Sequence, residues 1–109
     1  MPKPSLLKEA AEGGIAALEE LSAHVPRARR NLLAGLWAGR RLGLADAALA
    51  RFAADVMASD HEEVGDADVL RALRLAFAAA GVSVDDAELA RQLAEEGRRA
   101  YAQILSQQH

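Results

Sequence analysis

Residues 28–44 carry both faces of a complete amphipathic helix. Its apolar stripe consists of Leu32, Leu33, Leu36, Trp37 and Leu42, with Leu44 just beyond the helix. Five arginines flank this stripe, with no acidic residue between Pro26 and Leu44: Arg27, Arg29, Arg30, Arg40 and Arg41. Gly43 follows, and glycine ends helices in the left-handed conformation at the least steric cost. We therefore expect a helix over about 27–42 with a core face and a basic outer face.

The residue types of the whole chain favour an all-α fold. Among 109 residues there are 26 Ala and 16 Leu, no Thr, and only eight β-branched residues. Alanine and leucine are the best helix formers, whereas a sheet would need many β-branched side chains. The length is that of one domain with a core of its own.

Three further helices follow the first stretch. Over about 45–60 the apolar residues lie at helical spacing: Leu49, Phe52, Ala53, Val56 and Met57. A helix over about 67–80 is capped by Asp66, ends at Gly81 and buries Leu70, Leu73 and Phe77. A last helix, capped by Ser83, extends to about 106 and carries Leu89, Leu93, Tyr101, Ile104 and Leu105. Gly97 on its stripe indicates a close helix crossing. Together these elements predict a four-helix bundle over about 27–107.

An additional amphipathic helix is expected before the bundle, over about 5–23. A heptad-like seam runs through it and consists of Leu7, Ala11, Gly14, Leu18, Leu21 and Val25. Gly13 and Gly14 together cost about 2 kcal/mol relative to two alanines, so this helix needs a surface to lie on. The bundle, a second copy of the chain or another protein would each supply one. The expected division is an N-terminal arm over 1–25 and a bundle over 26–109.

Several ordered motifs resemble the ζ subunit family of the alphaproteobacterial F1FO-ATP synthase. They are Ala-Arg-Arg-Asn at 28–31, Gly-Leu-Trp-Ala at 35–38, Leu-Gly-Leu at 42–44, the acidic run with Val-Leu-Arg at 60–71, and Ala-Ala-Gly-Val at 79–82. The resemblance implies a helical bundle that docks on the F1 catalytic head and an N-terminal arm that inserts as a helix and restrains ATP hydrolysis. This arm departs from the family, because it has no aromatic residue, contains Gly13-Gly14 and is followed by Pro26.

Six residues of the second helix are candidates for binding a partner: Arg27, Arg29, Arg30, Asn31, Arg40 and Arg41. Guanidinium groups suit carboxylates of another protein. Alternatively, they form a solvated face that the chain's own acidic segment at 60–68 partly neutralises. Asn31 makes either a buried hydrogen bond or a partner contact. Trp37 is expected in the core, with an exposed binding role as the alternative.

Catalysis, metal binding and nucleic-acid binding find no support. The chain has no Cys, no phosphate-binding loop and no His-Glu-x-x-His motif, so we expect no enzyme and no cofactor. The acidic run lacks the spacing of a calcium loop and His61 stands alone, which favours capping and solvation. A net charge of −3 argues against nucleic acid as a partner. No apolar run reaches the length of a membrane span, so we expect a cytoplasmic chain.

Two functions remain open from the sequence. The first is a ζ-like accessory subunit that binds F1 and inhibits ATP hydrolysis, with weakened inhibition because of its arm. The second is a non-inhibitory paralogue that acts as a helical binding module, including a homodimer through the N-terminal seam.

Overall fold

The computed structural model describes residues 3–60 and 65–107. This part of the chain forms six α-helices and no strand, which confirms the all-α prediction. The helices are α1 (Pro4–Glu12), α2 (Ile15–Leu21), α3 (Pro26–Arg41), α4 (Asp46–Ala58), α5 (Ala67–Ala79) and α6 (Asp86–Ser106).

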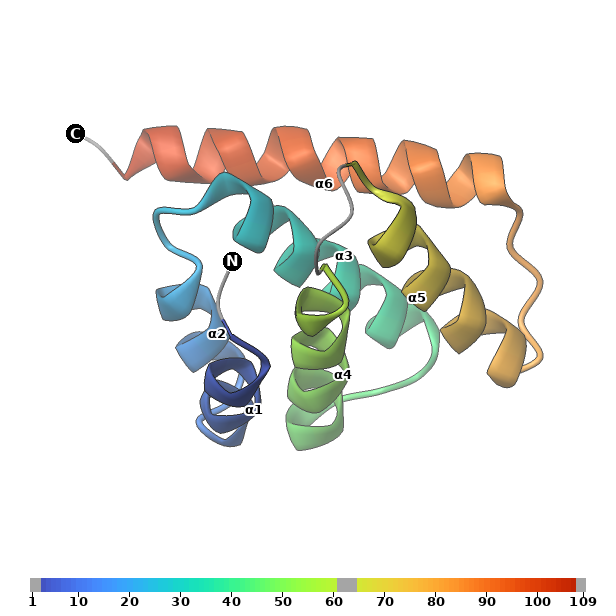
Figure 1. Cartoon of the computed structure of the whole chain (residues 1–109), viewed down its shortest axis with the longest axis horizontal. Coiled ribbons are helices and arrows are strands. Elements are labelled where there is room, and N and C mark those ends of the chain that lie inside the picture. Colours follow the sequence, from blue (N-terminus) through green and yellow to red (C-terminus); the bar gives the residue numbers. More distant parts are fainter. Residues whose placement is uncertain (1–2, 61–64, 108–109) are drawn as a thin grey trace.

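Helix α3 lies at the centre and contacts every other helix except α1 (Figure 1). The long helix α6 extends along one side of the molecule and packs on α3. Helix α5 lies at one end of this pair, α1 and α2 lie at the other end, and α4 stands between them. The C-terminal end of α6 therefore lies at the same end of the molecule as the arm.

The interior consists of two apolar clusters. The first joins α1 and α2 to α3 and α4, through buried side chains such as Leu7, Leu18 and Leu32. The second joins α3 and α4 to α5 and α6, through side chains such as Phe77 and Leu93. Because α3 and α4 contribute to both clusters, they connect the arm to the rest of the fold.

The single N-terminal helix expected over 5–23 is wrong, because two helices occupy this segment. Gly13 caps the C-terminal end of α1, and Gly14 takes a φ of 91°, outside the helical range. Two adjacent glycines weaken the helix where it would have to be continuous. The seam is therefore broken at Gly14 and carried by two short helices.

Glycines end the helices as predicted, whereas one N-cap differs. Gly43 and Gly81 have φ values of 83° and 72°, in the left-handed region that glycine favours. The predicted cap at Ser83 is wrong: Asp85 is the N-cap of α6, and its carboxylate accepts a hydrogen bond of 2.7 Å from the Glu88 amide. Asp66 holds the N-cap position of α5, but its side chain makes no capping hydrogen bond.

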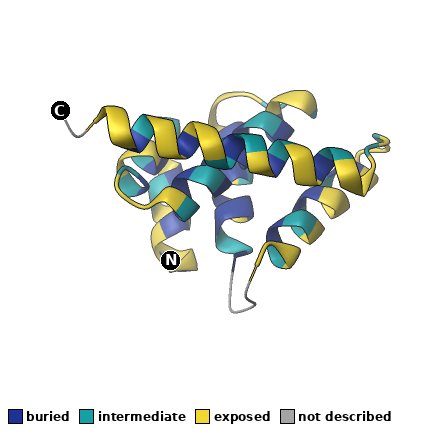
Figure 2. Cartoon of the chain, turned by 90° about the horizontal axis from the view of Figure 1, so that it is seen from above, coloured by how far each residue is buried: buried dark blue, intermediate teal, exposed yellow. Residues whose placement is uncertain are grey.

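Helix α6 is rotated relative to the prediction. Leu89, Leu93 and Ile104 are buried as expected. Tyr101 and Leu105 are each 52% exposed instead, so placing them in the core was wrong. The stripe of buried residues is completed by Glu96 and Ala100, and Figure 2 shows exposed and buried positions alternating along the whole helix.

The close helix crossing lies at α3 and α4, not at Gly97. A Cβ added at Gly97 would have ordinary contacts with the Arg30 side chain, at 3.5 Å. A Cβ added at Gly35 would lie 2.9 Å from the Ala53 Cα, and one at Gly39 would lie 2.5 Å from a Leu49 methyl carbon. Hydrogen atoms at these two positions allow the backbones of α3 and α4 to approach each other.

Candidate functional site

The arginines of α3 are the first part of the candidate site, and Arg29 lies inside the protein. Arg29 is 5% exposed and donates hydrogen bonds to the Ser22 hydroxyl at 3.1 Å, the Glu19 carbonyl at 2.7 Å and the Gln103 side chain at 3.0 Å. The Glu19 carbonyl belongs to the last turn of α2, where a cation complements the helix dipole. Arg29 therefore fastens α2 to α3 and α6.

A second internal contact joins the start of α3 to the end of α4. Asp60 is 6% exposed and accepts hydrogen bonds from Arg27, at 2.6 and 2.9 Å, and from the amide of Asn31, at 2.8 Å. Asn31 itself is fully buried. The sequence allowed either a buried hydrogen bond or a partner contact for Asn31, and in the structure Asn31 makes the buried hydrogen bond.

Arg30 extends this network to the start of α5. Its guanidinium donates to the side-chain oxygen Oδ1 of Asn31 at 2.8 and 3.0 Å and to the Asp66 carboxylate at 2.7 Å. Asp66 is thereby engaged by an arginine of α3, which explains why it does not cap its own helix. The sequence left open whether the arginines bind a partner or are neutralised by the chain's own acidic segment. For Arg27 and Arg30 the structure has the second arrangement, since they pair with Asp60 and Asp66.

The electrostatics of this network keep Asp60 ionised. The hydrogen bonds from Arg27 lower the pKa of the Asp60 carboxyl. Burial raises this pKa, but the hydrogen bond from Asn31 lowers it further, and the net shift is downward. The same hydrogen bonds raise the pKa of the Arg27 guanidinium. Both partners therefore stay charged at neutral pH.

Arg40 and Arg41 lie at the opposite end of α3, so the five arginines do not form one patch. Arg40 is exposed and makes no ion pair with any residue of the described ranges. Arg41 pairs with Glu88 at 2.9 Å and lies 5.7 Å from the centre of the Trp37 ring. Trp37 is half-buried and packs edge-on against Phe77 at the border of the second cluster, close to its expected place in the core.

The N-terminal seam is largely occupied within the chain itself. Leu7, Ala11 and Leu18 are at most 4% exposed and pack in the first cluster with α3 and α4. Leu21 and Gly14 are half-buried, and Val25 is 40% exposed. The sequence left three surfaces open for this segment: the bundle, a second copy of the chain or another protein. In the structure the segment packs on the bundle.

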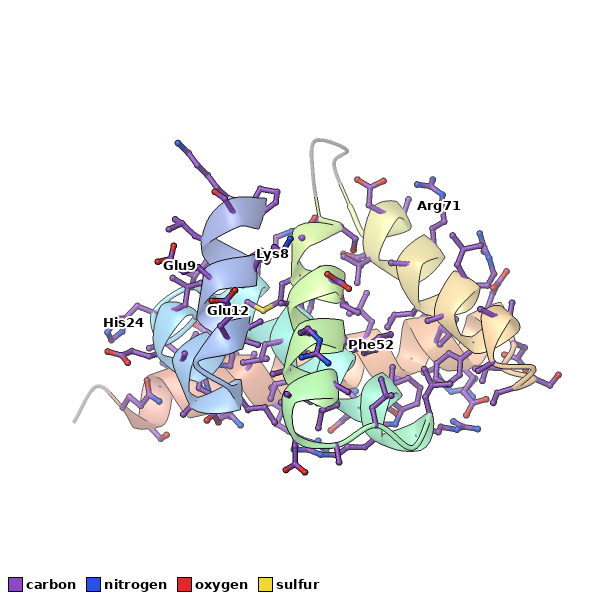
Figure 3. The ribbon with its side chains drawn as sticks, turned by 90° about the horizontal axis from the view of Figure 1, so that it is seen from below. Lys8, Glu9, Glu12, His24, Phe52 and Arg71 are labelled. Carbon is purple, nitrogen blue, oxygen red and sulfur yellow. The ribbon has the colours of Figure 1, made fainter. Side chains whose placement is uncertain are left out.

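A groove of about 390 Å³ runs along the contact between α1 and α4. Its floor is apolar and includes Leu7, Ala11 and Ala54, and its rim carries Lys8 on α1 and Arg51 on α4. Figure 3 shows Lys8 on the side of α1 that faces α4 and Glu9 on the other side. The rim is the part of the candidate site that sequence patterns do not reveal, because it forms only when α1 packs on α4.

Other kinds of site are not found in the described part of the chain. Its His, Asp and Glu residues form no group of three that would hold a metal ion. No helix within 3–60 and 65–107 combines the length and the apolar character of a membrane span. The prediction for His61, Glu62 and Glu63 lies outside the described residues.

Comparison with known proteins places the chain in a family. The family model described as ATPase inhibitor subunit zeta matches residues 7–103, from within α1 to near the end of α6. No curated protein and no solved structure matches significantly. Almost all of the chain is covered by the family model, including both internal networks. The chain belongs to the ATPase inhibitor subunit zeta family, and its role is that of a regulatory, non-enzymatic inhibitor subunit of the F1-ATPase.

Proposed function

We propose that α3–α6 bind the catalytic head of F1 and that the arm, residues 1–25, restrains ATP hydrolysis. The observation that carries this proposal is the family match over residues 7–103, because it includes the later part of α1 as well as the bundle. The division into an arm over 1–25 and a bundle over 26–109 is part of the proposal. We also propose that the protein acts on the cytoplasmic side of the membrane.

The docking surface is proposed at the C-terminal end of α3. Arg40 is exposed and makes no ion pair within the described residues, and Arg41 is partly exposed beside it. Free guanidinium groups suit the carboxylates of an acidic partner surface. Arg27 keeps 38% of its side chain exposed, but it lies at the other end of α3 and pairs with Asp60, so it is outside this surface. Arg29, Arg30 and Asn31 lie near the other end of α3 and make hydrogen bonds within the fold, so they are not part of this surface.

Inhibition through this arm is proposed to be weak. The face of α1 that carries Leu7 and Ala11 is already covered by α4. The described arm also offers no aromatic side chain with which to fill a pocket of the partner. Aromatic anchors contribute much of the energy of protein interfaces.

The test is a titration of the full chain into the F1-ATPase of its own organism, with binding and steady-state ATP hydrolysis measured on the same samples. A saturable fall in the hydrolysis rate that follows binding supports the proposal. Binding with an unchanged rate contradicts the inhibitory role of the arm, and absence of binding contradicts the docking of the bundle.

The non-inhibitory binding module is the second candidate, and the covered face of α1 favours it. A homodimer through the N-terminal seam is a further proposal of this kind. It requires α1 to exchange between two copies, because Leu7 and Ala11 are buried within one copy. Sedimentation of the protein over a range of concentrations tests this dimer: a mass that rises with concentration supports it, and a monomer at every concentration contradicts it.

A further inference from the structure

Helix α1 is attached to the protein along one narrow face. Leu7 and Ala11 are its buried side chains, whereas Leu6, one position away, is 48% exposed. The side chains of α1 make no hydrogen bond or ion pair with the described residues outside the helix. Apolar contacts, mostly with α4 and to a smaller extent with α2, therefore hold α1 in place together with the covalent chain.

The contact between α1 and α4 is also incompletely closed. The groove of about 390 Å³ lies along it, between Lys8 on one side and Arg51 and Asp55 on the other. Asp55 lies near enough to line the same groove as Lys8, yet the two side chains form no ion pair. A helix packed beside such a groove loses dispersion contacts that a closed interface would have.

The joint between α1 and α2 consists of Gly13 and Gly14. Gly14 has a φ of 91° and nothing lies within 4 Å of where its Cβ would be. Gly13 precedes it as the C-cap of α1, and the amides of Gly13 and Gly14 donate hydrogen bonds to the carbonyls of Ala10 and Ala11 at 2.9 and 3.0 Å. Gly13 is more crowded, since a Cβ there would lie 3.0 Å from the Ala17 Cβ, so the conformational freedom of the joint comes from Gly14.

Helix α2, by contrast, is firmly anchored. Leu18 is completely buried in the first cluster. Ser22, just after the helix, accepts a hydrogen bond from Arg29, which also holds the Glu19 carbonyl. The boundary between a loosely held and a tightly held element thus coincides with Gly13 and Gly14.

We infer that the packing of α1 on α4 is an autoinhibitory contact, from which α1 swings out about Gly13-Gly14 before it acts on F1. This inference rests on the proposed function of the arm. In the docked state Leu7 and Ala11 are withheld from the partner. In the released state α1 is free, and α2 stays fixed to the bundle. Inhibition is then limited by the fraction of molecules in which α1 is released.

The first test measures release without F1, by hydrogen exchange of the free chain. The backbone amides of α1 are expected to exchange at least about tenfold faster than those of α2, because local opening exposes the weakly held element first. Equal protection of the two helices would overturn the inference.

The second test locks α1 on α4. The chain contains no cysteine, so Lys8→Cys together with Asp55→Cys supplies the two thiols for a flexible bis-maleimide across the groove. The linked protein is expected to inhibit ATP hydrolysis about tenfold more slowly than the matched control, the same double variant with each thiol capped separately. Equal rates of inhibition in the two samples would overturn the autoinhibitory contact.

The two proposals fail in different ways. If the wild-type chain binds F1 without slowing hydrolysis, the proposed function of the arm is wrong, and the autoinhibitory role falls with it. The exchange measurement then still decides whether α1 detaches. A further variant, Ala54→Asp, loosens the contact from the α4 side with the arm unchanged, and it is expected to speed the onset of inhibition.

Discussion

Replacing Asp60 by Asn tests the network that joins α3 to α4. Asp60 accepts from Arg27 and Asn31, and its side chain is only 3% exposed. An amide presents one acceptor and one donor where the carboxylate presents two acceptors, so a donor faces a donor. A buried donor left without an acceptor costs about 1–3 kcal/mol. Solvent reaches Arg27, which is 38% exposed, so the ion pair itself adds only about 0.5–1 kcal/mol.

We therefore expect Asp60→Asn to lower the free energy of unfolding by about 2–3 kcal/mol at pH 7. A loss of this size corresponds to a fall in Tm of roughly 10–20 °C for a domain near 100 residues. The assay is urea unfolding, followed by circular dichroism and by Trp37 fluorescence. Glu95→Gln is the matched control, since it removes a carboxylate from an exposed pair with Arg98 and leaves no buried donor.

The pH dependence gives the sharper test. Folding lowers the pKa of Asp60, so its contribution is fully present above the ordinary aspartate pKa of about 3.9 and is lost as the pH falls through the lowered value. The stability difference between wild type and Asp60→Asn should hence shrink as the pH falls below about 4. A difference that stays constant over this range would refute the reasoning.

Three further changes have defined outcomes. Arg29→Ala should lower the free energy of unfolding by about 2–3 kcal/mol, because Ser22 and the end of α2 lose their donor; chemical denaturation measures this, and an unchanged midpoint would contradict the anchoring of α2. Gly35→Ala should cost about 1–3 kcal/mol despite its better helix propensity, since the new Cβ would lie 2.9 Å from the Ala53 Cα; a raised Tm would show that the crossing relaxes freely. Arg40→Glu should leave the fold intact and weaken binding to F1, as measured by co-sedimentation, with Arg91→Glu on the exposed face of α6 as the control.

Local rules predicted where helices begin and end with fair accuracy. Gly43 and Gly81 end helices because their conformation is a property of a few residues. The stripe of α4 was also correct: Leu49, Val56 and Met57 are buried, because they recur at helical spacing on one face of the segment. Element ends depend on nearby residues, and this information is in the sequence.

The orientation of α6 was not predictable in this way. Tyr101 and Leu105 were expected inside, whereas Glu96 is 1% exposed. Glu96 tolerates burial because Gln92 and Arg99 of the same helix donate hydrogen bonds to it. Which flank of a long helix meets α3 depends on all of its neighbours at once, and a periodic pattern does not contain that information.

The candidate site was foreseen in part. The charge opposition between the arginines and the acidic segment correctly indicated contacts such as Arg30 with Asp66. Nothing local identifies Ser22 and Gln103 as partners of Arg29, because the three meet only when α2, α3 and α6 pack together. Whether Arg40 and Arg41 bind F1 stays a prediction.

The narrow attachment of α1 has a consequence for how this protein can evolve. The fold constrains α1 chiefly at Leu7 and Ala11, so most of its other positions can accumulate substitutions at little cost to the bundle. Natural selection can then adjust the potency of an arm separately from the stability of the domain that carries it. Drift in the arm beside a well-preserved bundle is the pattern that such a division of constraints produces.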